Sequence, residues 1–111
     1  MTYNFGVCFP RQNFILVMHT LYILYSKGLD RYYVGETEDF NVRLEQHNTG
    51  YFKNSSTSNA SDWEEYLTAF CQDGSHARRV EMFIKRQKSR VFIESLRGDS
   101  QKLGSIIERF M

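Results

Sequence analysis

The 111-residue chain has little of what cross-links or breaks a fold. It contains one proline, Pro10, and two cysteines, Cys8 and Cys71, which form neither a CxxC pair nor a dense framework. This excludes a disulfide-stapled secreted scaffold and favours a reducing, cytoplasmic setting. The apolar run Phe14–Met18 is too short for a signal peptide, and no run approaches transmembrane length. We therefore expect a cytoplasmic protein with no membrane partner.

The composition that is present indicates one folded domain. Apolar residues make up 41% of the chain and aromatic residues 15%, which argues against disorder. Residues 1–17 show no clear period, so we expect a peripheral N-terminal extension. Strong patterning starts at Met18, which predicts a domain over 18–97. The remaining residues, 98–111, predict a C-terminal helix packed on that domain.

Charge is divided unevenly along the chain although the net charge is only +1. Residues 1–75 hold five Lys or Arg and nine Asp or Glu, giving −4, whereas residues 76–102 hold eight and three, giving +5. A polyanionic partner would meet the C-terminal half first. Two solvated helix faces would give the same composition, so charge alone does not decide between them.

The pattern of residues predicts an α+β fold, a small three-stranded antiparallel sheet flanked by helices. Thr37 is the expected N-cap of the first helix, and 51–62 is a polar loop. Strands are predicted at 19–26, 31–35 and 63–71, and helices at 38–47, 76–88, 90–96 and 101–110. The order is ββαβαα with an extra C-terminal helix, which favours a sheet covered by helices.

Three side chains do not fit a purely structural role. Arg43 and His47 lie one helical turn apart and border the apolar stripe of their helix. A buried or helix-terminal histidine is the structural alternative for His47. Glu81 flanks the apolar stripe of a later helix and needs a cation there, either a structural partner such as Arg43 or a metal ion that prefers oxygen ligands.

The spacing of these residues, with two tyrosines, resembles the GIY-YIG endonuclease family, which includes homing endonucleases and the nuclease module of a bacterial excinuclease. Thr20-Leu21-Tyr22 stands where the family has Gly-Ile-Tyr, and Tyr33-Val34-Gly35 where it has Tyr-Ile-Gly. Arg43, His47 and Glu81 follow at matching positions. The resemblance covers residues 20–97 and is strongest to small stand-alone bacterial members. The asparagine that larger members place beyond the glutamate has no clear counterpart.

The resemblance implies a metal-dependent endonuclease that hydrolyses DNA phosphodiester bonds, with a place in DNA repair. Glu81 would hold Mg²⁺ or Mn²⁺, and Tyr22 would act as general base. His47 would relay that proton or be an alternative base. Arg43 would clamp the phosphate, and Tyr33 would position water or phosphate.

DNA is the expected partner, bound through its phosphate backbone. The sequence has no helix-turn-helix or zinc-finger pattern, so we do not expect it to read a DNA sequence. It would instead recognise DNA structure or damage, cut weakly, or be targeted by a protein partner. We expect a monomer or a weak homodimer. A catalytically weak module that binds nucleic acid or protein is the alternative. The expected DNA-binding residues are Lys53, Arg78, Arg79, Lys85, Arg86, Lys88 and Arg90.

Overall fold

The computed structural model describes residues 18–53 and 56–111. Its strands are β1 (His19–Ser26), β2 (Arg31–Thr37) and β3 (Trp63–Cys71), and they form an antiparallel sheet in the order β2-β1-β3. The predicted α+β fold with a small three-stranded sheet is confirmed. The predicted N-terminal extension, 1–17, lies outside the described residues.

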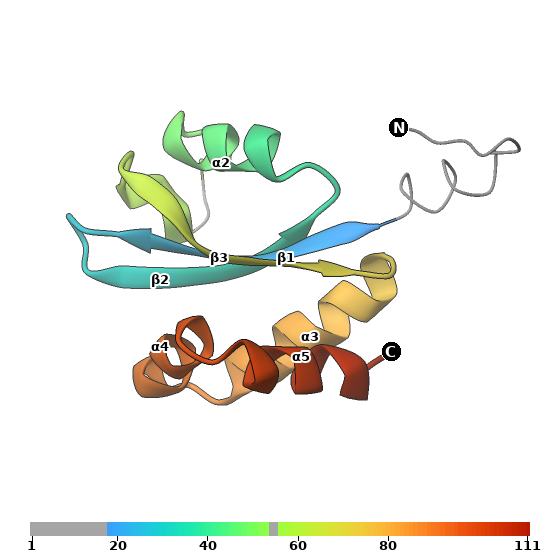
Figure 1. The fold of residues 1–111 in the computed structure, drawn as a ribbon. Helices are drawn as coiled ribbons and strands as arrows, with labels where there is room; N and C mark the ends of the chain where they lie inside the picture. Colours follow the sequence, from blue (N-terminus) through green and yellow to red (C-terminus); the bar gives the residue numbers. More distant parts are fainter. Residues whose placement is uncertain (1–17, 54–55) are drawn as a thin grey trace, which may run out of the picture.

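Helices cover both faces of the sheet (Figure 1). Helix α2 (Phe40–Asn48) and the short 3₁₀ helix η2 (Ser56–Asn59) lie on one face. Helices α3 (Gly74–Arg86), α4 (Arg90–Arg97) and α5 (Ser100–Arg109) lie on the other. The sheet is therefore the middle of three layers, and β2 is an edge strand that both helical layers can reach.

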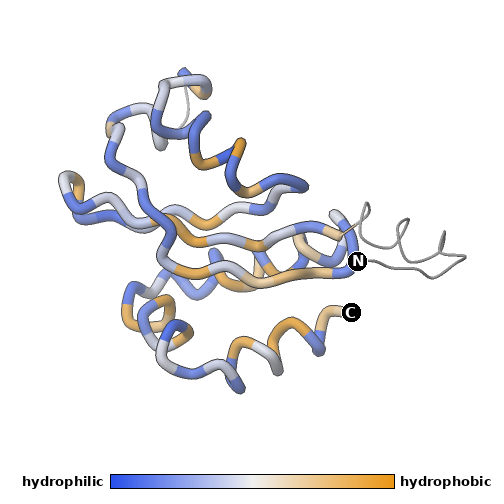
Figure 2. The backbone as a smooth tube through the Cα atoms, turned by 45° about the horizontal axis from the view of Figure 1, so that its top comes forward, coloured by the Kyte–Doolittle hydropathy of each residue, from blue (hydrophilic) through white to orange (hydrophobic). Residues whose placement is uncertain are grey.

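The central strand, β1, is apolar without alternation because both of its faces are buried. Leu21 and Ile23 point into a core with α3, α4 and α5, whereas Tyr22 and Leu24 point into a second cluster with Trp63 on the α2 side. A strand buried on both faces loses the usual polar positions. In Figure 2 hydrophobic segments run along the strands, and hydrophobic and hydrophilic segments alternate along the helices.

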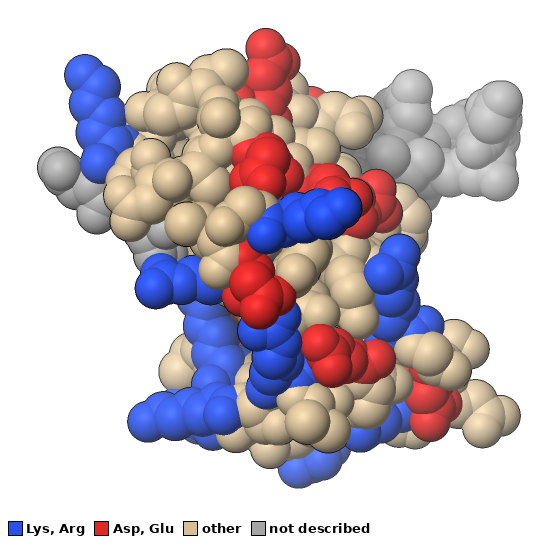
Figure 3. All heavy atoms as spheres, turned by 90° about the vertical axis from the view of Figure 1, so that its left-hand side faces the viewer, with Lys and Arg blue, Asp and Glu red and all other residues tan. Residues whose placement is uncertain are grey.

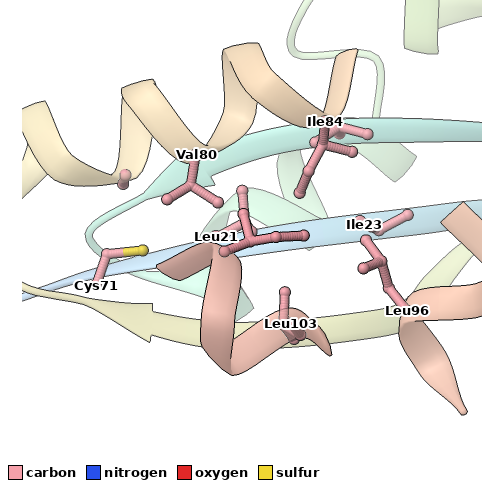
Figure 4. Close-up of a cluster of buried hydrophobic side chains, with 10 residues drawn as sticks. Leu21, Ile23, Cys71, Val80, Ile84, Leu96 and Leu103 are labelled. Atoms are coloured by element: carbon pink, nitrogen blue, oxygen red, sulfur yellow. The ribbon is translucent and has the colours of Figure 1, made fainter. Parts of the chain in front are cut away.

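The larger of the two hydrophobic clusters connects α3, α4 and α5, which form the lower layer in Figure 1, to the sheet. Figure 4 shows Val80 and Ile84 from α3, Leu96 from α4 and Leu103 from α5 packed around Leu21 and Ile23. His76 adds a polar connection between α3 and α5. Its Nδ1 accepts from the Gln72 amide at 3.0 Å, so its Nε2 donates to the Ile107 carbonyl at 2.7 Å. A buried histidine with both nitrogens bonded stabilises this layer.

Helices α2 and α3 each begin after an aspartate whose side chain caps the first turn, and the cap of α2 differs from the predicted one. Asp39, not Thr37, caps α2, since its carboxylate accepts from the Val42 amide at 3.2 Å. Thr37 instead ends β2, because it pairs with Thr20 on β1. Helix α3 begins at Gly74, two residues before the prediction, because Asp73 caps it. It ends at Arg86, and Lys88 takes a left-handed backbone (φ 47°) that no helix continues.

Candidate active site

Tyr22 is placed by the sheet register and by a glycine. It pairs with Gly35 on β2, and a Cβ at position 35 would lie 2.6 Å from both the Tyr22 hydroxyl oxygen and Cζ. The phenol ring therefore crosses β2 where only a glycine leaves room. This explains the glycine in the middle of a strand, and it carries the hydroxyl from the central strand over the edge strand.

At that position the Tyr22 hydroxyl meets a histidine. The hydroxyl oxygen lies 2.9 Å from Nε2 of His47, and Nδ1 of His47 lies 2.8 Å from Oγ1 of Thr57. His47 is only 2% exposed. A neutral imidazole has one donor and one acceptor nitrogen, so the three side chains form a continuous hydrogen-bonded chain across the α2 side.

Burial shifts the pKa of both members of this pair away from their charged forms. Burial raises the pKa of the Tyr22 phenol, the Tyr33 and Glu81 charges raise it further, and the Arg43 charge acts in the opposite direction. Burial, helped by the Arg43 charge, lowers the pKa of His47 to about 4. At neutral pH the pair is thus a phenol beside a neutral imidazole.

Tyr33 connects the two layers at the sheet edge. Its ring centroid lies 5.0 Å from that of His47 and 6.3 Å from that of Tyr22 on the α2 side. Nζ of Lys85, from α3 on the opposite side, lies 5.8 Å from the same ring centroid. We call the group Tyr22, Tyr33, Arg43, His47, Glu81 and Lys85 the β2-edge site.

Arg43 is held over an aromatic ring. Its guanidinium carbon lies 5.4 Å from the Phe52 ring centroid, and the Phe52 ring lies 4.9 Å from that of His47. Arg43 also lines a pocket of about 260 Å³ together with Glu36 and Gln46. The ring supports the guanidinium on one side, and the same guanidinium acts on the Tyr22 hydroxyl.

Glu81 carries the negative charge of the site. Its side chain is 17% exposed, and its Oε2 lies 2.6 Å from Nζ of Lys85. The expectation that Arg43 is its structural partner is wrong, because the cation beside it is Lys85. The described residues contain no group of three or more His, Cys, Asp or Glu side chains that could hold a metal together.

The donor set nevertheless fits one kind of ion. A single carboxylate suits Mg²⁺ or Mn²⁺, which prefer oxygen ligands, and Mg²⁺ keeps several of its waters when one or two carboxylates bind it. Glu81 is also close enough for its charge to act on the Tyr22 phenol. Glu81 is therefore the residue that would hold such an ion at the β2-edge site.

The predicted DNA-binding residues divide by location. Arg78 is exposed and lies 3.8 Å from Glu36, and Lys85 stands beside Glu81, so both border the site. Arg86, Lys88 and Lys53 are exposed. Arg79 instead donates to the Phe110 carbonyl, and Arg90 pairs with Asp30 and Glu94. Figure 3 shows the Lys and Arg side chains gathered mainly over the lower, helical part of the molecule.

Two residues of the site escaped sequence reasoning. Thr57 is fully buried against His47, and Phe52 supports both His47 and Arg43. Phe52 left a signal, since it is a large aromatic residue in an otherwise polar loop. Thr57 left none, because it stands in a run of similar hydroxyl residues and only the fold selects one of them.

Comparison with known proteins identifies the family of the chain. The family model of the GIY-YIG catalytic domain matches residues 18–94. No curated protein and no solved structure matches the chain. Within the described residues, no helix is long and apolar enough to cross a membrane. The match spans both tyrosines, Arg43, His47 and Glu81, and the chain therefore belongs to the GIY-YIG family of nuclease domains.

Proposed function

We propose that this protein is a cytoplasmic, divalent-metal-dependent endonuclease that hydrolyses phosphodiester bonds in branched, nicked or damaged DNA. The observation that carries the proposal is the contact between the Tyr22 hydroxyl and Nε2 of His47 at 2.9 Å. The charges of Arg43 and Glu81 act on the same phenol. A proton acceptor, a cation and a carboxylate thus converge on one hydroxyl.

The paired side chains support a proton relay. Burial disfavours both a free phenolate and a charged imidazole, so Tyr22 would pass its proton to His47 only as it takes one from the attacking water, and the negative charge of the bound phosphate would have to stabilise the charged His47. The water oxygen bonds to phosphorus, and the bond to the 3′ oxygen breaks. This requires the His47 tautomer with its proton on Nδ1, which donates to Thr57 and leaves Nε2 free to accept.

The other residues of the site act on charge and position. Arg43 would bind the phosphate through its N–H fork and stabilise the charge that develops on it. Tyr33, between His47 and Lys85, would orient the water or a phosphate oxygen. An ion held by Glu81 would withdraw charge from the phosphate and the leaving oxygen.

An exposed aromatic residue supports the choice of substrate. Tyr51 is 66% exposed and packs edge-to-face on Phe52, with ring centroids 5.0 Å apart, and Phe52 is the ring that lies under Arg43. An exposed ring suits stacking on an unpaired base, which branched DNA with single-stranded arms offers and intact duplex does not. Phosphate contacts from Arg78, Arg86, Lys88 and Lys53 would add affinity without sequence selection.

A cleavage assay tests the proposal. Purified protein is incubated with nicked, branched and supercoiled DNA in Mg²⁺ or Mn²⁺ and in EDTA. We expect cleavage that needs the metal and falls by a factor of about 10² to 10³ in Tyr22→Phe and in Glu81→Gln.

Matched controls separate chemistry from folding. Tyr25→Phe removes an exposed hydroxyl bonded to Asp30, and Glu108→Gln removes an exposed carboxylate on α5. Both should cleave at the wild-type rate. Cleavage that persists in EDTA, or is equal in Glu81→Gln and Glu108→Gln, would contradict the assignment.

One observation favours a second candidate, a module that binds nucleic acid without cutting it. The carboxylate expected to hold a metal is already paired with Lys85 at 2.6 Å. If that pair is permanent, the site binds phosphate through its cations alone. DNA binding in EDTA without cleavage in any metal would support this candidate.

A further inference from the structure

The side of α3 that borders the site alternates in charge. Arg78, Glu81 and Lys85 are three and four residues apart, so they lie in one row along the helix. Arg78 pairs with Glu36 on β2, and Lys85 lies over the ring of Tyr33 on β2. This row of side chains therefore faces the edge strand, and within it the Glu81 carboxylate is paired with Lys85.

This placement creates a competition. Lys85 and a divalent ion would compete for the carboxylate of Glu81. Nζ of Lys85 is 2.6 Å from Oε2, which leaves no room for an ion bound to that oxygen. The Lys85 side chain is 48% exposed, whereas that of Glu81 is 17% exposed. The flexible ammonium can therefore move away while the carboxylate stays in place.

We propose that the Lys85 ammonium stays paired with the Glu81 carboxylate until a divalent metal ion displaces it, and that the released ammonium then binds a DNA phosphate. This inference rests on the proposed function and adds to it a regulatory device. Without DNA and metal, the lysine neutralises a carboxylate that would otherwise repel the phosphate. With both present, the two positive charges are separated between carboxylate and phosphate.

If a metal ion displaces Lys85 from Glu81, the binding of metal and the binding of DNA become thermodynamically linked. If the metal frees a phosphate-binding cation, then metal binding strengthens DNA binding, and DNA strengthens metal binding by the same factor. The residue one turn after Glu81 is a cation, so the Glu81–Lys85 pair is charge-balanced without a metal.

Mn²⁺ titration of the whole protein, followed by the electron paramagnetic resonance signal of free Mn²⁺, tests the first half. We expect Lys85→Met to bind Mn²⁺ about fivefold more tightly than wild type, the upper end of what a partly exposed ion pair contributes. Lys85→Arg, which keeps the charge and the pairing, should stay near wild type. Lys27→Met, which removes the same charge from an exposed position in the turn between β1 and β2, should also stay near wild type because salt screens it.

Glu81→Gln separates failure of this inference from failure of the proposed function. Mn²⁺ binding that is unchanged in Glu81→Gln would overturn both. Binding that is lost in Glu81→Gln but not strengthened in Lys85→Met would overturn the exchange alone and leave the metal site standing.

Binding of a nicked duplex tests the second half of the proposal, in a Tyr22→Phe background in which cutting is slow compared with the binding measurement. Adding Mn²⁺ should strengthen DNA binding by a larger factor when Lys85 is present than in Lys85→Met. Lys27→Met should retain the larger factor. Equal factors with and without Lys85 would overturn the transfer of the ammonium to the phosphate.

Discussion

The two faces of the sheet differ in what they bury. The face toward α3, α4 and α5 buries ten hydrophobic residues in one cluster. The face toward α2 buries Tyr22, Leu24 and Trp63 together with the polar His47 and Thr57. Apolar burial stabilises a fold, whereas buried polar groups require partners and fix them in place. The first face therefore supplies stability, and the second supplies an ordered set of reactive groups.

One strand serves both faces. Successive residues of β1 point to opposite sides, so Leu21 and Tyr22 are neighbours in sequence but belong to different layers. Substitutions on the lower face should thus change stability without changing the chemistry of the site. Substitutions on the α2 face should change the chemistry of the site as well as stability, because its buried polar groups depend on their partners. Three experiments test this division.

The largest effect is expected from a cavity in the lower core. Leu96→Ala removes a side chain that is 1% exposed and packed between α4 and the sheet. We expect the free energy of unfolding, measured in urea, to fall by about 3 kcal/mol. Cleavage of nicked DNA, measured where the variant is still folded, should match wild type.

Val91→Ala is the matched control for that cavity. Val91 lies on the same helix but is 75% exposed, so its truncation leaves no void. Its free energy of unfolding should change by less than about 0.5 kcal/mol. A loss of cleavage in Leu96→Ala at full folding would contradict the separation of the two faces.

A pH-dependent effect is expected from His47 on the α2 face. Its pKa is about 4 in the folded protein and 6.5 in the unfolded chain. Between these values the unfolded state binds a proton that the folded state does not. Stability is therefore full above pH 6.5 and falls as the pH drops toward 4. At pH 4.5 the group should have lowered the free energy of unfolding by about 2 to 3 kcal/mol.

His47→Gln removes this titration. The difference in unfolding free energy between wild type and His47→Gln, measured in urea at pH 7 and 4.5, should shift by that amount in favour of the variant at low pH. Leu96→Ala is the control. Its loss of unfolding free energy relative to wild type involves no titrating group, so it should be equal at both pH values. A constant deficit for His47→Gln would show that His47 titrates normally.

Local sequence rules identified most of the fold and much of the site. The strand Trp63–Cys71 was predicted to the residue, because turn residues bound a run of β-formers. Asp39 replaced Thr37 as a cap because pairing with β1 holds Thr37 in the strand. Helical spacing placed Arg43 and His47 on one inner face and Glu81 at the edge of another.

What could not be predicted were contacts between distant elements. Thr57 binds His47 through a loop whose path depends on the whole sheet. The pair of Glu81 and Lys85 is different, because the two residues are four apart on α3 and helical spacing alone brings them together. Periodicity does not report which hydroxyl of a distant loop reaches a buried histidine, because that depends on the packing of layers.

The smallest of the three losses of stability is expected in Gly35→Ala, which should also reduce cleavage. A Cβ there would lie 2.6 Å from the Tyr22 hydroxyl oxygen and Cζ, so Gly35→Ala must displace a buried ring. Overpacking of this kind should lower the free energy of unfolding by about 2 kcal/mol. Displacing the hydroxyl from His47 should reduce cleavage by a factor of about 10².

Gly104→Ala on α5 is the same substitution on the other side of the molecule. A Cβ there meets no atom within 4 Å, and alanine favours a helix, so the variant should gain up to about 1 kcal/mol of stability. Its cleavage should be unchanged. If Gly35→Ala lost stability but cleaved like wild type, the hydroxyl position over β2 would not matter to the reaction. The role assigned to Tyr22 would then fail even though the fold and family remain.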